Sequence, residues 1–247
     1  MTHSVERTGT TVTKRYTSWP RNEPARELAA LTLLTRSAPD LVPEPLSSSE
    51  DPTPWLTMTH VPGVPLSGSL TSTQLNALGD ALNTLWSIPP TGLTPIDLPA
   101  LIHRTHAGLT ALADHPTPVG QAARTWLQHE FPDLTAVHTP VVAHGDPNLT
   151  NYLWDGSQVR IIDFEDAGLG DRTVELANLV EHLSGRATDW QPLVRRFAVE
   201  PERFRAARCL WAGFWLTLIG PGGPSSDRNP PGTAEAQAAR VIRLVAG

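Results

Sequence analysis

The segment VAHGDPNLTNYLWDGSQVRIIDFED, residues 142–166, decides how the rest of this 247-residue chain is interpreted. It holds one histidine, four aspartates, one glutamate and two asparagines, although only 18% of the chain is charged. Between these polar groups lies a short stretch, YLW, that has the composition of a strand. Carboxylate and amide oxygens gathered in this way indicate a site for a hard cation or for a substrate that accompanies one.

A hairpin within this segment would bring two of the oxygen ligands together. Residues 152–154 and 159–162 flank Asp155-Gly156, which is a favoured turn pair. Asn151 and Asp163 then lie at the open end of the hairpin, where both can face one ion. Magnesium prefers oxygen ligands of these kinds together with water and substrate phosphates. The sequence therefore predicts a magnesium site formed by Asn151 and Asp163.

Asp146 lies five residues before Asn151, on the tight His-Gly-Asp-Pro bend. From there its carboxylate can point at a substrate hydroxyl beside the metal. Phosphoryl transfer needs this arrangement, because positioning and electrostatic stabilisation do most of the work while a carboxylate accepts the hydroxyl proton. The segment thus favours a phosphotransferase.

The pattern H-G-D-x-x-x-x-N over residues 144–151, followed by I-D-F-E-D-A-G-x-G-D over residues 162–171, resembles the aminoglycoside phosphotransferase and choline kinase-like family. The match rests on about thirty consecutive residues, 142–171, with weaker agreement over most of the chain. Members of this family phosphorylate small molecules on a protein-kinase-like fold. The resemblance implies an α+β, two-lobed protein-kinase-like fold with a small, β-rich N-lobe and a larger helical C-lobe.

The resemblance also assigns roles. Asp146 would be the catalytic base, and Asn151 and Asp163 would hold Mg²⁺. Lys14, the single lysine among 19 basic residues, would hold the phosphates of ATP or GTP, with Glu27 as its ion-pair partner. A compact ammonium suits the space between phosphates better than a planar guanidinium does.

The segment LTMTHVPGVPL, residues 56–66, looks like the family's connection between lobes. Met58 would then border the adenine pocket. The Thr59 carbonyl and the Val61 amide would form hydrogen bonds with the base.

Local patterns give the organisation of the chain. Two strands are expected within Ser4–Tyr16 around Thr8-Gly9, followed by a helix from about Pro24 to Pro39, a loop over 47–54 and a strand over 55–61. We expect the N-lobe at 1–61, the connector at 62–66 and the helical C-lobe at 67–247. Helices of the C-lobe are expected from the capping box at Thr71 and Gln74 onward, and over 99–114, 118–131, 173–183, 201–218 and 233–245.

Only 13 residues precede Lys14, so the N-lobe is expected to be truncated relative to the family, with Gly9 alone where a loop would cover the phosphates. This keeps a second hypothesis open, a catalytically weak kinase-like module that binds a nucleotide or metabolite. A third is a metallohydrolase using His144, Asp146 and Asp163, although such sites usually have more histidines at ligand spacing. His144 is otherwise expected to be structural, and Glu175 to brace the catalytic loop.

The composition excludes other classes. A net charge of −6 disfavours nucleic acid as a partner. The most apolar stretch, CLWAGFWLTLIG, is shorter than the roughly 18 residues of a membrane span, and the N-terminus has no apolar signal region. The single cysteine, Cys209, is expected in the core. We expect a cytoplasmic protein without a nucleic-acid or membrane partner.

The acceptor is expected to be a neutral or anionic hydroxylated metabolite or antibiotic. Residues 186–247, where the resemblance implies that the substrate lies, carry 9 arginines against five acids. A polycationic aminoglycoside would need a wall of carboxylates. Trp211, Phe214 and Trp215 recur at helical spacing, and we expect at least two of these rings in the core and one free to stack on the acceptor.

Overall fold

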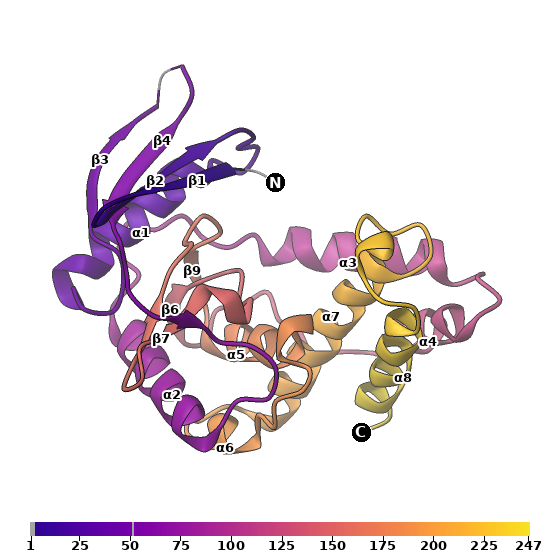
Figure 1. Ribbon diagram of the computed structural model, residues 1–247. Coiled ribbons are helices and arrows are strands. Elements are labelled where there is room, and N and C mark those ends of the chain that lie inside the picture. The colour runs from indigo at the N-terminus through magenta and orange to yellow at the C-terminus, as the bar shows by residue number, and fades with distance from the viewer. Residues whose placement is uncertain (1–2, 51) are drawn as a thin grey trace.

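The structure, a computed structural model, describes residues 3–50 and 52–247. Figure 1 shows a small antiparallel sheet with one helix beside it, and a larger, mostly helical part. The predicted α+β organisation is confirmed.

The sheet lobe is built around the strand that carries Lys14. In chain order its elements are β1 (His3–Thr8), β2 (Thr11–Tyr16), α1 (Glu23–Ser37), β3 (Pro45–Ser49) and β4 (Trp55–Thr59). The strands pair antiparallel in the order β1-β2-β4-β3. Gly9 has a φ of 61°, which suits the tight turn between β1 and β2. The predicted strand pair around Thr8-Gly9 is therefore confirmed.

Helix α1 packs its apolar stripe against this sheet. Ala30, Leu31 and Leu34 are fully buried. Glu27 precedes them by one turn on the same face and is also buried. The helical period thus carries a carboxylate to the sheet face beside β2.

Two predictions for this lobe need correction. The expected loop over 47–54 is strand up to Ser49, because β3 pairs with β4 as an exposed edge strand. Its serines give no hydrophobic alternation, and Pro45 is tolerated at the first position of an edge strand. The strand expected over 55–61 ends at Thr59.

The helical lobe follows. In chain order its elements are β5 (Val64–Pro65), α2 (Ser72–Ser87), α3 (Leu98–Leu112), α4 (Pro118–Leu127), β6 (Pro140–Ala143), η1 (Leu149–Asn151), β7 (Tyr152–Trp154), β8 (Val159–Ile161), β9 (Gly168–Asp171), α5 (Arg172–Glu181), η2 (Leu183–Gly185), α6 (Gln191–Val194), α7 (Pro201–Ile219), η3 (Ser226–Arg228) and α8 (Thr233–Ala246). Within the described residues, no helix combines the length and the hydropathy that crossing a membrane requires.

Most helix predictions hold within a few residues. The capping box at the start of α2 is present, since the Gln74 amide donates to Thr71 Oγ1 at 3.3 Å and the Thr71 amide donates to Gln74 Oε1 at 3.0 Å. The helix expected over 118–131 ends at Leu127. Pro132 disfavours helical backbone at the residue before it, which accounts for part of this difference.

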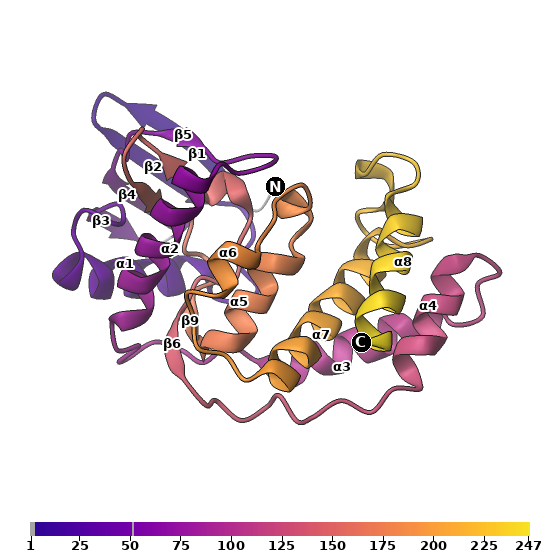
Figure 2. The same cartoon turned by 90° about the horizontal axis from the view of Figure 1, so that it is seen from below.

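Two hydrophobic clusters hold the molecule together. One joins α1 and the sheet to α2 and the hairpin, through residues such as Tyr16, Leu56, Leu78 and Phe164. The other lies among α3, α4, α7 and α8, which form a group on one side of α5 in both views (Figures 1 and 2). Cys209 is buried in this second cluster, as predicted.

The small strands of the helical lobe position the segment 142–166. β7 and β8 form the predicted hairpin, with Tyr152 opposite Ile161. Its turn has four residues, 155–158, and not the expected two, because Asp155 Oδ1 accepts hydrogen bonds from the amides of Ser157 and Gln158 at 2.9 Å. β5 pairs with β7, so part of the expected connector 62–66 is strand.

Candidate active site

The loop that carries Asp146 is held by its neighbours on every side. Pairing of β6 with β9 sets Ala143 opposite Gly168, so that residues 144–146 lie beside residues 163–167. Glu175 Oε2 accepts hydrogen bonds from the amides of His144 at 3.0 Å and of Gly145 at 3.3 Å. Gly145 has a φ of 82°, and a Cβ there would collide with the Asp166 backbone. Glu175 therefore braces this loop, as expected.

His144 is a structural residue. Its Nε2 lies 2.8 Å from the Ile162 carbonyl oxygen, and its ring packs 4.8 Å from that of Phe164. The residue is 2% exposed. These contacts use the imidazole to join two loops and do not support the metallohydrolase hypothesis.

Asp146 is accessible while being held in place. Its side chain is 41% exposed. Oδ1 accepts a hydrogen bond from the Asn148 amide at 3.3 Å, and Oδ2 accepts one from Asn151 Nδ2 at 3.3 Å. Asn151 Nδ2 also donates to the Asp146 carbonyl at 3.0 Å. Because the amide nitrogen of Asn151 is turned to Asp146, its amide oxygen faces away from it.

Asp163 has a φ of 68°, which is uncommon for a residue other than glycine. Such backbone conformations persist where the surroundings fix them, and they cluster at functional sites. The Asp163 carboxylate forms an ion pair with Lys14. Burial raises the pKa of Asp163, but the ammonium outweighs this and leaves the pKa below its ordinary value.

Lys14 is surrounded by carboxylates. Its Nζ lies 2.8 Å from Glu27 Oε2 and 2.8 Å from Glu165 Oε2, in addition to its contact with Asp163. Burial lowers the pKa of Lys14, whereas the three carboxylates raise it and prevail. One ammonium among three carboxylates leaves the cluster with excess negative charge, which suits a site that also receives a cation.

A cavity of about 250 Å³ opens beside Lys14. It is lined by His3, Val5, Val12, Lys14, Glu27, Pro43, Met58, Thr59, His60, Val61, Leu153, Ile162 and Asp163. All five residues that the sequence predicts for nucleotide binding are therefore brought together, along with Asp163. Among the residues that the structure describes, the Val61 amide has no hydrogen-bond acceptor. Two of the lining residues, His3 and Val5, belong to β1. The short segment before Lys14 therefore still places a strand beside this cavity.

A second cavity, of about 470 Å³, opens at Asp146. Its lining residues are Arg21, Arg26, Ile96, Asp97, Leu101, Arg104, Gly145, Asp146, Pro147, Asp166, Glu175, Asn178, His182, Trp211, Phe214, Trp215 and Leu218. Asp146 and Asp163 thus belong to different cavities. The link between them is Asn151, which bonds to Asp146 by its side chain and to the Ile162 amide by its carbonyl at 2.9 Å.

The expectation of a neutral or anionic acceptor was based on the arginines of residues 186–247, and the residues that line the second cavity correct this reason. Its arginines come from the front of the chain and from α3, whereas residues 186–247 contribute only apolar and aromatic groups. Three arginines of that tail surround the buried Glu181. Asp166 lines the cavity, but its Oδ1 lies 2.6 Å from Arg21 Nη1. Arg104 is exposed and, within the described residues, has no acidic partner.

The aromatic wall of this cavity lies on α7. Trp211 is buried and donates its indole N–H to the Val174 carbonyl at 3.1 Å. Phe214 and Trp215 are half-buried. Trp211 belongs to the second hydrophobic cluster and Phe214 packs against it, so at least two of the rings contribute to the core as expected, and all three also line the cavity.

Sequence reasoning missed two groups near Asp163. Glu165 contacts Lys14, and His3 Nδ1 lies 3.0 Å from Glu165 Oε2. One ligand atom from each of His3, Asp163 and Glu165 lies within 4.8 Å of the others, which makes them a candidate metal group. The signal for Glu165 was present, since it stands two residues after Asp163. His3 carried none, because only the β1–β2 pairing brings it there.

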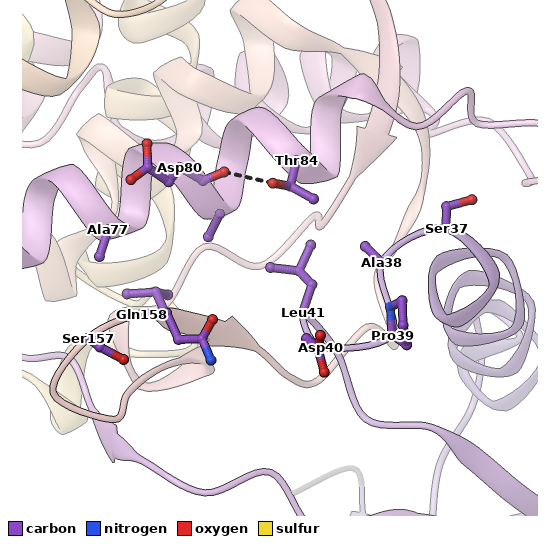
Figure 3. Close-up of a pocket in the computed structure, with 12 residues that line it drawn as sticks. Ser37, Ala38, Pro39, Asp40, Leu41, Ala77, Asp80, Thr84, Ser157 and Gln158 are labelled. Atoms are coloured by element: carbon purple, nitrogen blue, oxygen red, sulfur yellow. Dashed lines mark hydrogen bonds between the residues drawn. The ribbon is translucent and has the colours of Figure 1, made fainter.

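A third cavity, of about 390 Å³, is separate from this site. It lies between the end of α1, helix α2 and the β7–β8 turn (Figure 3). It shares no lining residue with the other two cavities and contains no residue that the motif predicts.

The two-lobed fold, with its lysine strand, adjoining helix and hairpin-borne aspartate, is that of a protein-kinase-like phosphotransferase. Residues 4–210 match the model of the phosphotransferase enzyme family. The chain belongs to this family and is a small-molecule kinase by class. No curated protein matches its sequence.

Solved structures show the same fold. A choline/ethanolamine kinase family protein from Mesorhizobium loti has a TM-score of 0.65 and 18% identity, covering 100% of this chain and 84% of that chain. The GDP complex of aminoglycoside 2'-phosphotransferase-IIIa gives 0.61 and 15%, covering 100% and 90%. A thermostable mutant of aminoglycoside phosphotransferase APH(4)-Ia, in ternary complex with ADP and hygromycin B, gives 0.62 and 17%, covering 99% and 94%.

Proposed function

We propose that this protein transfers the γ-phosphate of ATP or GTP to a hydroxyl group of a small neutral or anionic molecule, with Asp146 as the catalytic base. The observation that carries the proposal is the division of the site into two cavities. Lys14 and Asp163 line the smaller one, and Asp146 lines the larger one. A phosphate donor in the smaller cavity and an acceptor molecule in the larger one would meet near Asn151, which is hydrogen-bonded to Asp146 on one side and to Ile162 on the other.

The smaller cavity suits a nucleoside triphosphate. Lys14, held by Glu27, offers a compact ammonium to the phosphates. Met58 provides an apolar surface for the base, and the Val61 amide is available as a donor. These features support the assignment of Lys14, Glu27, Met58, Thr59 and Val61 to nucleotide binding.

Asp163, which lines this cavity, and Asn151, whose carbonyl accepts from the amide of the lining residue Ile162, fit a magnesium ion. Asn151 and Asp163 supply an amide oxygen and a carboxylate, which are hard ligands, and the Asn151 oxygen faces away from Asp146. When bound, Mg²⁺ neutralises negative charge on the phosphates of the nucleotide. Asp163 would exchange its ion pair with Lys14 for the metal.

Asp146 would act on the acceptor molecule and not on the nucleotide. Its exposed carboxylate can accept the proton of a hydroxyl that enters the larger cavity, while the hydroxyl oxygen forms its bond to phosphorus. The hydrogen bonds from Asn148 and Asn151 fix the direction of the carboxylate. Orientation of this kind is what a general base needs most.

The direct test is incubation of the purified protein with Mg²⁺, ATP or GTP and a panel of hydroxylated metabolites and antibiotics. Mass spectrometry of each candidate should show one that gains a phosphoryl group. Asp146→Asn should slow this gain by about 10²–10⁴-fold in a parallel incubation. Nucleotide binding without transfer to any member of a broad panel would favour the alternative, a catalytically weak binding module.

A further inference from the structure

His182 ends helix α5 directly beside the catalytic loop. It follows the buried Glu181, its side chain is 7% exposed, and it lines the larger cavity. Its Nε2 lies 3.6 Å from Asp146 Oδ1. The Trp215 ring meets the imidazole edge to face, with centroids 4.7 Å apart and planes at 88°. The imidazole is therefore held firmly between an aromatic ring and the carboxylate.

The other ring nitrogen shows which tautomer His182 adopts. The Ser184 amide donates a hydrogen bond to His182 Nδ1 at 3.2 Å. Ser184 Oγ lies 2.7 Å from the same nitrogen and itself accepts from the Leu149 amide at 2.9 Å. A backbone amide can only donate, so Nδ1 must be an acceptor. The proton of the neutral imidazole is then on Nε2, the nitrogen that faces Asp146.

The ring stays neutral near pH 7. Burial lowers the pKa of His182 to about 4, although the Asp146 carboxylate opposes the shift. A neutral donor orients a carboxylate without placing a full positive charge beside it. The carboxylate therefore keeps its ability to accept a proton.

We propose that His182 is a positioning residue for Asp146, acting through its Nε2–H group, and this inference rests on the proposed role of Asp146 as the base. Oδ1 faces two donors, the Asn148 amide and His182, whereas Oδ2 faces, among the described residues, only the Asn151 amide group. Oδ2 is then the oxygen that takes the hydroxyl proton. The proton on His182 stays where it is, while the new O–P bond forms and the bond from phosphorus to the leaving nucleoside diphosphate breaks.

A purely structural role predicts something different. Through Nδ1 alone, His182 caps η2 and, by way of Ser184, secures Leu149 at the start of η1. That role would make no use of Nε2. Two substitutions separate the nitrogens, because the amide nitrogen of glutamine can occupy the position of Nε2, whereas asparagine reaches only the position of Nδ1.

The test compares His182→Gln with His182→Asn in the 247-residue chain. We expect the asparagine variant to lose about 10- to 100-fold in kcat, with KM for the nucleotide within about twofold of wild type, since it removes the N–H group that faces the Asp146 carboxylate at 3.6 Å. The glutamine variant should retain at least about ten times the kcat of the asparagine variant. Equal losses in both variants, or no loss in either, would overturn the inference.

A second measurement does not depend on turnover. In ¹⁵N-labelled protein, the imidazole resonances of His182 should show the Nε2–H tautomer at neutral pH. Asp146→Asn should shift the Nε2 resonance of His182 and leave that of His106 in place. An Nδ1–H tautomer would refute the inference, and so would a His182 Nε2 resonance that is unchanged by Asp146→Asn. A protein that binds nucleotide but phosphorylates nothing would refute the proposed function, while these spectra would still decide the role of His182.

Discussion

Lys14 Nζ lies 2.8 Å from Glu27 Oε2, and the two side chains are 4% and 1% exposed. Tyr16 donates its hydroxyl to the same carboxylate oxygen at 2.5 Å. Removing two charges from water costs several kcal/mol, which only close pairing and further hydrogen bonds offset. The stability that the Lys14–Glu27 ion pair contributes therefore depends on side chains of the present size and shape.

Lys14→Arg should impair the protein although the charge is kept. The larger guanidinium must enter a site with almost no free space, so we expect the free energy of unfolding to fall by about 1–3 kcal/mol. KM for the nucleotide should rise by about tenfold, because the ammonium geometry is lost. Denaturant titration and steady-state kinetics measure the two effects. Arg15→Lys, at the exposed neighbouring position of β2, is the matched control and should change neither quantity.

Asp146→Asn should leave the fold and nucleotide affinity intact and lower kcat by about 10²–10⁴-fold. The substituted side chain can still accept from the Asn148 amide through its oxygen, so the loop should keep its shape. Circular dichroism and nucleotide titration establish folding and binding, and initial rates give kcat. Asp227→Asn, in the exposed η3 turn, serves as the control. A folded Asp146→Asn protein with wild-type kcat would remove Asp146 from the mechanism.

Sequence reasoning was most informative for the parts of the site whose residues lie close together in the sequence. Asp146, Asn151 and Asp163 fall within 18 residues, and the hairpin between them carries its own turn signal. Lys14 stood out as one lysine beside 18 arginines, and the family resemblance assigned Glu27 as its ion-pair partner. The contacts that bring these groups together agree with that interpretation.

Tertiary contacts account for what sequence reasoning missed. His182 meets Asp146, and Arg21 meets Asp166, across separations that no local pattern records. The arginines of the larger cavity come from before α1, from α1 and from α3, whereas charge counting had placed the relevant basic residues in the C-terminal segment. β3 was missed because an exposed edge strand of serines has no hydrophobic period.

Transfer should require magnesium or manganese, and Asp163→Ala should abolish it at saturating nucleotide. Alanine is strained at a φ of 68°, whereas asparagine tolerates this conformation. Asp163→Asn therefore separates loss of the carboxylate from loss of backbone shape, and it should be nearly as inactive as Asp163→Ala. Metal titration of the initial rate checks the requirement. Full activity in excess EDTA, or in Asp163→Asn, would contradict the metal role.

Protonation of His182 should destabilise the fold in acid. Its pKa is about 4 in the folded protein and about 6.5 in an unfolded chain, so between these values the unfolded state binds the extra proton. The stability that His182 contributes is present above pH 6.5 and is lost as pH falls toward 4. The loss should be about 2–3 kcal/mol. Chemical denaturation at several pH values measures it.

His182→Gln is the control for this pH dependence, because it removes the titrating group. The comparison matters because burial raises the pKa of Asp166 to about 6, so that Asp166 favours folding as pH falls over the same window. The difference between wild type and His182→Gln isolates the histidine. Identical stability profiles of the two proteins would show that His182 does not titrate in this way.

The charge of Arg104 should make the larger cavity favour neutral or anionic acceptors over polycationic ones. Of the acids that line the larger cavity, Asp166 is paired with Arg21, Glu175 is committed to backbone amides and Asp97 caps α3. Few carboxylates are left for several ammonium groups, and an exposed guanidinium repels them. At low salt, kcat/KM for neutral or anionic alcohols should therefore exceed that for kanamycin-type polycations. Arg104→Glu should shift this ratio toward the polycations by about tenfold. Arg243→Glu on α8 makes the same change in net charge and should leave the ratio unchanged. A wild-type preference for the polycations would overturn the assignment of a neutral or anionic acceptor.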